Sequence, residues 1–171
     1  MRILDFGAGR GAMALALREK GADVVAVEPS GSDHLTKLGL AAYSDMDKLP
    51  SNLSFDGIVC VEVLEHLLSP NDALAKLYER LKPGAWIFVT TPNAAGLPAM
   101  LAGGNWREAK KPGHILFITP VALGTLLQKT RIRDSRRLRW LVRYPGVSGA
   151  RIGSSHFAAA PIGWRLTISG I

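Results

Sequence analysis

Two kinds of hydrophobic pattern alternate along the first 130 residues of the chain. Short apolar runs without alternation are typical of buried parallel strands, and they occupy residues 2–6, 24–27, 55–60 and 85–90, with a weaker run at 40–43. Apolar residues at helical spacing separate them at 11–20, 32–38 and 70–81, and a last helix is expected to begin at Pro120. Strands that alternate with helices predict an α/β fold with a doubly wound, mostly parallel sheet and helices on both faces.

The sequence gives more detail about two segments, the first helix and the stretch after the fifth strand. Ala12, Leu15, Ala16 and Glu19 share one helical face, with Met13 and Leu17 beside them, and Gly21 suits the left-handed position that ends this helix. Residues 94–113 are rich in glycine and predict a long loop.

Three alternating glycines, Gly7, Gly9 and Gly11, follow the first strand. Glycine tolerates a positive φ and has no Cβ, so a turn of this kind and the helix start behind it allow a ligand to approach the backbone closely. Glu28 stands at the expected carboxyl end of the second strand, where an acid can accept hydrogen bonds from both hydroxyls of a ribose. The pattern predicts a nucleoside cofactor, and a solvated loop glutamate is the alternative for Glu28.

Composition and charge narrow the class of partner. At 171 residues and 47% hydrophobic content the chain suits one domain with a sizeable core. The net charge is +7, but residues 1–128 carry 12 basic and 13 acidic residues, so the positive charge belongs to residues 129–171. We therefore do not expect nucleic acid as a partner. A basic tail that tethers nucleic acid is the alternative, although it lacks interleaved aromatic positions for base stacking.

Cys60 is the single cysteine and cannot form an internal disulfide, which favours a reducing compartment. No charged and apolar leader precedes the first strand, and no apolar run approaches ~18 residues. The expected location is the cytoplasm, with no membrane partner.

Four blocks of sequence occur in an order and spacing that one known family shares. They are ILDFGAGRG, VVAVEPS, FDGIVCVEVLEHL and LYERLKPGAWIFVTTPN. With them the chain resembles class I S-adenosylmethionine-dependent methyltransferases, and more narrowly the small-molecule group (type 11, 12 or 23) with an E-V-L-E-H block. The resemblance covers residues 1–128. It implies a Rossmann-like sheet, S-adenosylmethionine as cofactor and methyl transfer to a small-molecule acceptor, with oxygen as the expected accepting atom.

A nicotinamide dehydrogenase is the competing fold interpretation. Gly7, Gly9 and Ala12 satisfy its dinucleotide fingerprint, and Glu28 fits it equally well. Asp5, placed within the first strand just before the turn, favours the methyltransferase, and the chain lacks room for a separate substrate domain.

The resemblance implies a set of cofactor-binding positions and no metal site. The positions are Asp5, Gly7, Ala8, Gly9, Gly11, Glu28, Asp45, Met46 and Glu62. In this family pattern Asp5 lies near the amino group of the cofactor and Glu28 binds its ribose. Asp45 and Met46 lie beside the adenine, and Glu62 lies at the rim. A solvated loop acid is the alternative for Asp45.

Two histidines are candidate catalytic bases, because methylation of a hydroxyl usually needs one and histidine titrates near neutral pH. His66 follows the fourth strand, close to the expected transfer site, and a structural hydrogen-bonding role is its alternative. His114 could reach the same place from the other side. Trp106 is expected either to contact substrate as part of a lid or to anchor the 94–113 stretch.

The resemblance stops near residue 128 and sets the expected domains. Residues 1–128 form the predicted methyltransferase domain. Residues 129–171 form either a degenerate last strand pair, near 139–144 and 164–168, or a non-native or disordered tail, which the acid-poor composition favours.

The beginning of the chain also departs from the family pattern, which usually has some tens of residues, forming helices that partly cover the cofactor, before the first strand. These cap helices are missing here, so a fragment, a start assigned too late or an open site are all consistent with the sequence. The second functional hypothesis is accordingly a truncated or decayed domain that binds cofactor weakly and catalyses nothing.

Overall fold

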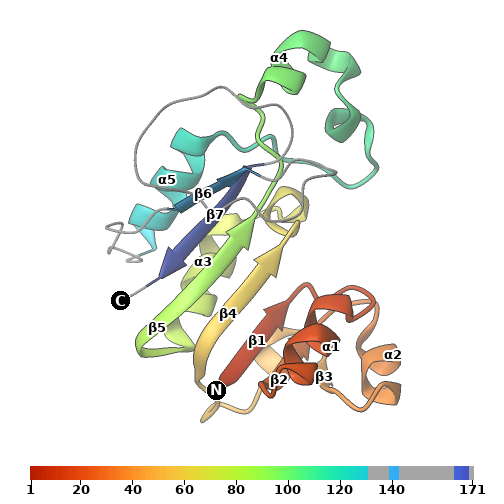
Figure 1. Cartoon of the computed structure of the whole chain (residues 1–171), viewed down its shortest axis with the longest axis vertical. Coiled ribbons are helices and arrows are strands. Elements are labelled where there is room, and N and C mark those ends of the chain that lie inside the picture. Colours follow the sequence, from red (N-terminus) through yellow and green to blue (C-terminus); the bar gives the residue numbers. More distant parts are fainter. Residues whose placement is uncertain (131–138, 143–163, 170–171) are drawn as a thin grey trace.

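The computed structural model describes residues 1–130, 139–142 and 164–169, and it shows one sheet flanked by helices (Figure 1). The strand order is β3-β2-β1-β4-β5-β7-β6. The parallel strands are β1 Arg2–Phe6, β2 Asp23–Val27, β3 Ala41–Tyr43, β4 Phe55–Val61 and β5 Leu81–Thr90. Antiparallel pairing adds β7, Trp164–Ser169, to β5, and β6, Arg139–Val142, to β7.

The α-helices of the described residues are α1 Ala12–Glu19, α2 Ser32–Lys37, α3 Pro70–Glu79, α4 Leu97–Ala102 and α5 Pro120–Lys129. Short 3-10 helices cover Met46–Lys48, Leu64–His66, Gly103–Asn105 and Arg107–Lys110. The predicted α/β fold with a doubly wound, mostly parallel sheet is confirmed. Whether 129–171 belongs to the domain or forms a separate tail stays a prediction, since most of it lies outside the described residues.

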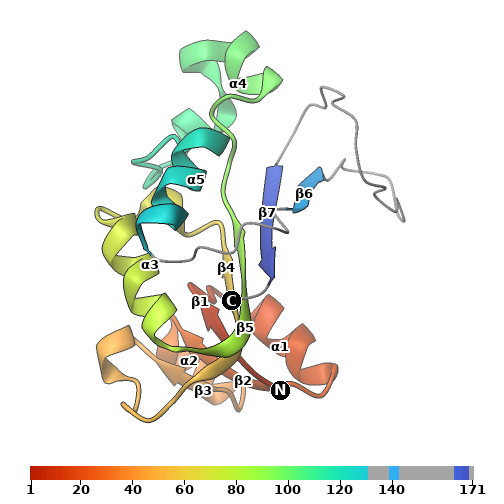
Figure 2. The same cartoon turned by 90° about the vertical axis from the view of Figure 1, so that its left-hand side faces the viewer.

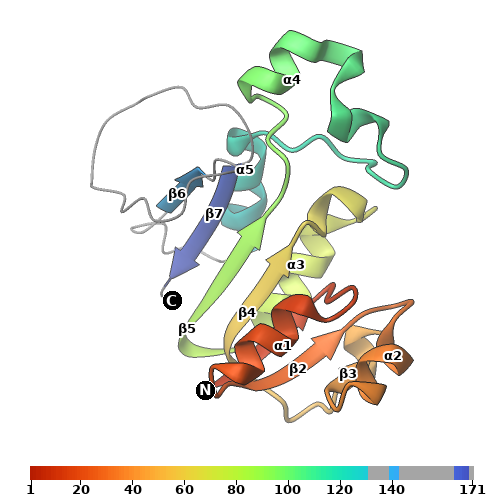
Figure 3. The ribbon, with the colours of Figure 1, turned by 45° about the vertical axis from the view of Figure 1, so that its right-hand side comes forward.

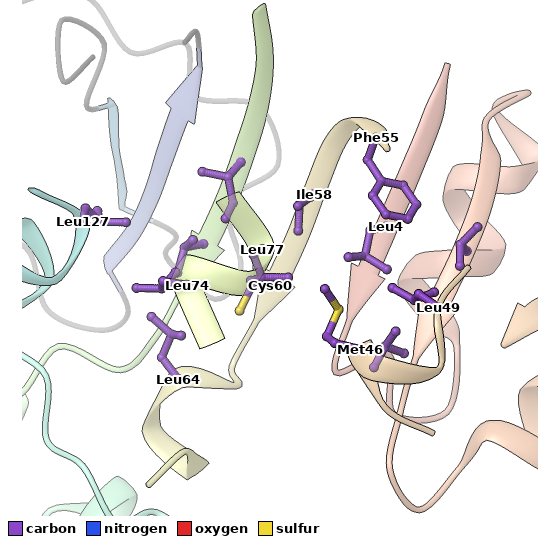
Figure 4. Close-up of a cluster of buried hydrophobic side chains, with 14 of the residues drawn as sticks. Leu4, Met46, Leu49, Phe55, Ile58, Cys60, Leu64, Leu74, Leu77 and Leu127 are labelled. Atoms are coloured by element: carbon purple, nitrogen blue, oxygen red, sulfur yellow. The ribbon is translucent and has the colours of Figure 1, made fainter. Parts of the chain in front are cut away.

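Helices cover both faces of the sheet. Figure 2 shows α1 on one side of the strands and α3 with α5 on the other. The larger core cluster lies on the α3 and α5 side, where Leu74, Leu77 and Leu127 pack against Ile58 and Ile87 of the sheet (Figure 4). Successive strand residues point to opposite faces, so Val24 and Ala26 of β2 belong to a second cluster on the α1 and α2 side.

The buried face of α1 is centred on Ala14. Ala14 is fully buried and packs in the second cluster with Val24 and Leu35, whereas Ala12 and Ala16 are exposed. Alanine, leucine and methionine occupy most positions of α1, so the spacing of apolar residues does not identify its buried face. The small side chain of Ala14 allows the helix to lie close to β2.

Two boundaries around β5 are also different. The strand begins at Leu81, four residues earlier than expected, because a register irregularity opposite Phe55 and Gly57 accommodates the Pro-Gly pair inside it. After β5 the stretch 94–113 is not a simple loop, since it contains α4 and two 3-10 helices. None of the described helices has the length and apolar character needed to cross a bilayer.

The parallel arrangement brings the carboxyl ends of the strands to one edge. Phe6 at the end of β1 pairs with Val27 of β2 and Cys60 of β4, and Val61 pairs with Thr90 of β5. Figure 3 shows the chain leaving this edge at the end of β5 and forming α4 beyond it. The residues that follow β1, β2, β4 and β5 therefore lie along one side of the molecule, where ligands bind in open α/β sheets.

Candidate functional site

The glycine turn after β1 has a conformation that other residues rarely adopt. Gly7, Gly9 and Gly11 have φ values of 75°, 54° and 86°. The N–H groups of Gly7 and Ala8 donate to the carbonyl of Val27 at 2.8 and 3.2 Å, which ties the turn to the end of β2.

Close packing also requires glycine at the first of these positions. A Cβ on Gly7 would lie 2.3 Å from Cγ2 of Val63, in the segment after β4. The turn is thus held between the end of β2 on one side and the segment after β4 on the other.

Gly9 is the position in the turn that faces open space. A Cβ there would meet no protein atom within 4 Å, and its N–H donates to Oε2 of Glu28 at 2.8 Å. The other carboxylate oxygen of Glu28 accepts from the N–H and the hydroxyl of Ser30 at 3.3 and 3.1 Å. Glu28 is therefore held across the turn with its carboxylate beside that open backbone, where the ribose role was predicted.

Asp5 is a buried carboxyl just before the turn. It is 2% exposed, and within the described structure its Oδ2 has no hydrogen-bond partner. Burial is the main cause that raises its pKa to about 6; the nearby charge of Glu28 acts in the same direction, and a backbone hydrogen bond from Ala14 acts against both. An unpaired buried oxygen of this kind is costly unless a donor or a cation completes it, so Asp5 fits a positively charged group of a cofactor.

Asp45 and Met46, which follow β3, differ in exposure. Asp45 is exposed and caps the short helix after β3, since its Oδ1 accepts from the N–H of Asp47 at 2.7 Å. Met46 is 7% exposed, and its side chain packs in the larger core cluster with Leu49. Their predicted place beside an adenine remains a prediction.

Glu62 has an unusual backbone at the end of β4. Its φ is 55°, and among the described residues no other non-glycine residue has a positive φ. The left-handed region costs a side-chain-bearing residue roughly 1–2 kcal/mol. Hydrogen bonds with Thr90 hold it there: its N–H donates to the Thr90 carbonyl at 2.9 Å and to the Thr90 hydroxyl oxygen at 3.2 Å, and that hydroxyl donates to its Oε1 at 3.0 Å.

The structure brings the two candidate histidines together. The rings of His66 and His114 lie edge to face with their centroids 4.6 Å apart. His66 is exposed, and its Nδ1 lies 2.8 Å from the carbonyl of Gly113. A carbonyl only accepts, so Nδ1 carries the proton and Nε2 of the neutral ring keeps its lone pair.

His114 is the more enclosed of the pair. Its side chain is 5% exposed, and Nδ1 lies 3.8 Å from Oε2 of Glu108. Burial, with the neighbouring His66 and Lys111, lowers the pKa of His114. Lys111 and Arg107 form ion pairs with Glu108 at 2.6 and 2.7 Å. Trp106 is half-buried and lies 6.2 Å from the ring of Phe117, the kind of contact that anchoring of this segment predicts.

Glu65 was missed as a site residue. It is 1% exposed, its Oε2 accepts from the Thr91 hydroxyl at 2.9 Å, and burial raises the pKa of its carboxyl. The signal available was its three-residue spacing from Glu62. Glu65, His66 and His114 each bring a potential ligand atom within 4.8 Å of the others, so this group has the donor types for a divalent metal.

These features define the class of protein. A mostly parallel α/β sheet, a left-handed glycine turn after β1, an acid after β2 and a buried acid with an unpaired oxygen just before the turn are features of a class I S-adenosylmethionine-dependent methyltransferase. Residues 1–130 match the family described as a methyltransferase domain, and the chain belongs to that family. S-adenosylmethionine is the cofactor of this class, which excludes the dehydrogenase alternative.

Curated relatives and solved structures agree with this assignment. The chain is 25% identical over 154 residues to a ubiquinone biosynthesis O-methyltransferase of Leptothrix cholodnii, with 82% of this chain and 61% of the relative covered. It is 27% identical to a mitochondrial protein of the same description from Schizosaccharomyces pombe, covering 93% of this chain and 68% of the relative. The chain thus spans less than two thirds of the length of the Leptothrix relative.

A solved structure shows the same fold. The crystal structure of a SAM-dependent methyltransferase from Archaeoglobus fulgidus superposes with a TM-score of 0.73 at 19% identity, and the match covers 98% of this chain and 85% of that one. The comparisons give no support to the decayed-domain hypothesis.

Replacing Glu62 separates backbone strain from charge. We expect Glu62→Gly to be more stable than Glu62→Ala by about 1 kcal/mol, because only glycine adopts a φ of 55° without strain. Both variants lose the carboxylate and are expected to bind S-adenosylmethionine more weakly than the unchanged protein. Thermal unfolding measures the difference in stability, and calorimetric titration measures the loss of affinity. Equal stability of the two variants would show that the backbone at Glu62 is not strained.

Asp5 predicts a pH dependence of cofactor binding. Its pKa is about 6, so the carboxyl is charged above that pH and neutral below it. Affinity for the cationic S-adenosylmethionine is expected to fall by up to about tenfold per pH unit as the pH drops below 6. Asp5→Asn should bind weakly at every pH and lose most of this dependence in titrations at pH 5 and 7.5. The same pH profile in both proteins would exclude Asp5 as its origin.

Proposed function

We propose that this chain transfers a methyl group from S-adenosylmethionine to a hydroxyl oxygen of a small-molecule acceptor, with His66 as the base. The observation that carries the proposal is the hydrogen bond from Nδ1 of His66 to the carbonyl of Gly113, because it leaves Nε2 of an exposed ring free to take a proton. The names of the relatives, which are O-methyltransferases, support oxygen as the accepting atom.

The bound cofactor supplies an electrophilic methyl group on a sulfonium centre, so the protein has to orient the reactants and exclude water. The open backbone at Gly9 would lie against the cofactor, Glu28 would accept hydrogen bonds from its ribose, and Asp5 would face its amino group. Gly7, Ala8 and Gly11 set the shape of the turn. Asp45 and Met46 would lie beside the adenine, and Glu62 would add a negative charge near the sulfonium.

On the acceptor side, Nε2 of His66 would take the proton of the acceptor hydroxyl and so make its oxygen a stronger nucleophile. His114 packs edge-on against this ring and is kept neutral by its lowered pKa, so it adds no positive charge that would disfavour the protonated base. Glu65, whose Oε1 has no hydrogen-bond partner in the described structure, lies beside both rings and favours the charge that develops on His66.

Cofactor binding is the first test. Gly9→Val is expected to lose measurable S-adenosylmethionine binding in calorimetric titration, because its side chain would fill the open space beside Glu28. Gly21→Val is the matched control, since Gly21 also has a positive φ and open surroundings but lies at the far end of α1. Absence of binding by the unchanged protein, or equal loss in both variants, would contradict the assigned cofactor site.

His66 gives the test of chemistry. A panel of phenols, catechols and aliphatic alcohols, with amines of matching shape, identifies the accepting atom by mass increase of the product. With the best acceptor, His66→Gln is expected to lower kcat by about 100-fold or more while cofactor affinity stays within about twofold. Methylation of the amines alone, or an unchanged kcat, would overturn oxygen transfer with His66 as base.

A further inference from the structure

The Thr90 hydroxyl forms hydrogen bonds with both the backbone and the side chain of Glu62. The hydroxyl oxygen accepts from the Glu62 N–H at 3.2 Å and, through its own proton, donates to Glu62 Oε1 at 3.0 Å. A hydroxyl has one proton to donate and lone pairs to accept with, so both bonds are satisfied at once. Thr90 is fully buried, so its hydroxyl has no solvent to exchange with.

The backbone does not need this hydroxyl. The Glu62 N–H also donates to the Thr90 carbonyl at 2.9 Å, the shorter of its two bonds. The contribution specific to the Thr90 hydroxyl is therefore that it holds the Glu62 carboxylate in position. A left-handed residue at φ 55° is a local strain, and strain at such a position persists where surrounding contacts over-determine it.

The segment that begins at Glu62 also reaches the cofactor cradle. Val63, the next residue, is the one whose side chain a Cβ on Gly7 would strike at 2.3 Å. The charge of Glu62 also acts on the buried Glu65 and on His114. Glu62 therefore adjoins the residue that packs on the glycine turn, and its charge reaches the group around the two histidines.

We infer that Thr90 is a positioning residue that aims the Glu62 carboxylate at the positive sulfonium and so makes the site prefer the cationic cofactor over its neutral product. This inference rests on the proposed cofactor. S-adenosylmethionine carries a sulfonium, and S-adenosylhomocysteine carries a neutral thioether at the same place. A carboxylate held at that point favours the first over the second, and it helps product to leave after the charge has gone.

The test is the ratio of the dissociation constants for the two ligands, measured by calorimetric titration. Thr90→Val removes the hydroxyl with little change of shape. It is expected to weaken S-adenosylmethionine about fivefold or more and to change S-adenosylhomocysteine less than about twofold. Thr90→Ser keeps the hydroxyl and should retain the ratio of the unchanged protein.

Thr91→Val is the control for loss of a buried hydroxyl at the same strand end, because Thr91 bonds to Glu65 instead. It should leave the ratio unchanged. Glu62→Gln should reproduce the effect of Thr90→Val, and Thr90→Val should add nothing in that background. If circular dichroism shows that Thr90→Val does not fold, the ratios of dissociation constants of Glu62→Gln and Thr90→Ser test the inference instead.

The outcomes are distinct. Equal weakening of both ligands, an unchanged ratio in Thr90→Val or Glu62→Gln, or the same shift in Thr91→Val would overturn the positioning role. Failure of the unchanged protein to bind either ligand would instead overturn the proposed function.

Discussion

The candidate site depends on the parallel pairing of β1 with both β2 and β4. Phe6 is level with Val27 on one side and Cys60 on the other, so the chain leaves all three strands at the same edge. The turn that starts α1 must then pass between the end of β2 and the side chain of Val63. At Gly7 only a residue without a Cβ fits, and the positive φ values of Gly7, Gly9 and Gly11 favour glycine throughout the turn.

The same edge concentrates negative charge. Asp5, Glu28, Glu62 and Glu65 all lie near it, and two kinds of donor hold them: a backbone N–H for Asp5 and Glu28, and a threonine hydroxyl for Glu62 and Glu65. Their mutual repulsion adds to burial in raising the pKa of Asp5 and of Glu65. A cation bound at this edge offsets that repulsion, so the electrostatics of the protein alone favour a positively charged ligand.

The parts of this arrangement that local pattern encodes could be predicted from the sequence. Buried apolar runs and alternating glycines located β1, β2, β4 and the turn, and chain order then placed Glu28. Contacts between distant segments could not be predicted. The His66–His114 pair joins residues from two separate segments, and it forms because the Glu65 carbonyl accepts from the N–H groups of Ile115 and Leu116 at 2.9 and 3.1 Å. The bond between Thr90 and Glu62 depends likewise on strand register.

The candidate site has a cofactor half and an acceptor half, and the hydrogen bonds to the Glu65 carbonyl join them. The two halves differ in how much sequence change they tolerate. The cofactor half is built by β1, β2 and β4, whose glycine turn tolerates no added Cβ at Gly7. In the proposed function the acceptor half includes the segment that leaves β5, forms α4 and returns at Ile115. Because the return is fixed by main-chain bonds, side chains between these points can vary without moving His114. The fold therefore allows the acceptor to change while the cofactor site stays constant.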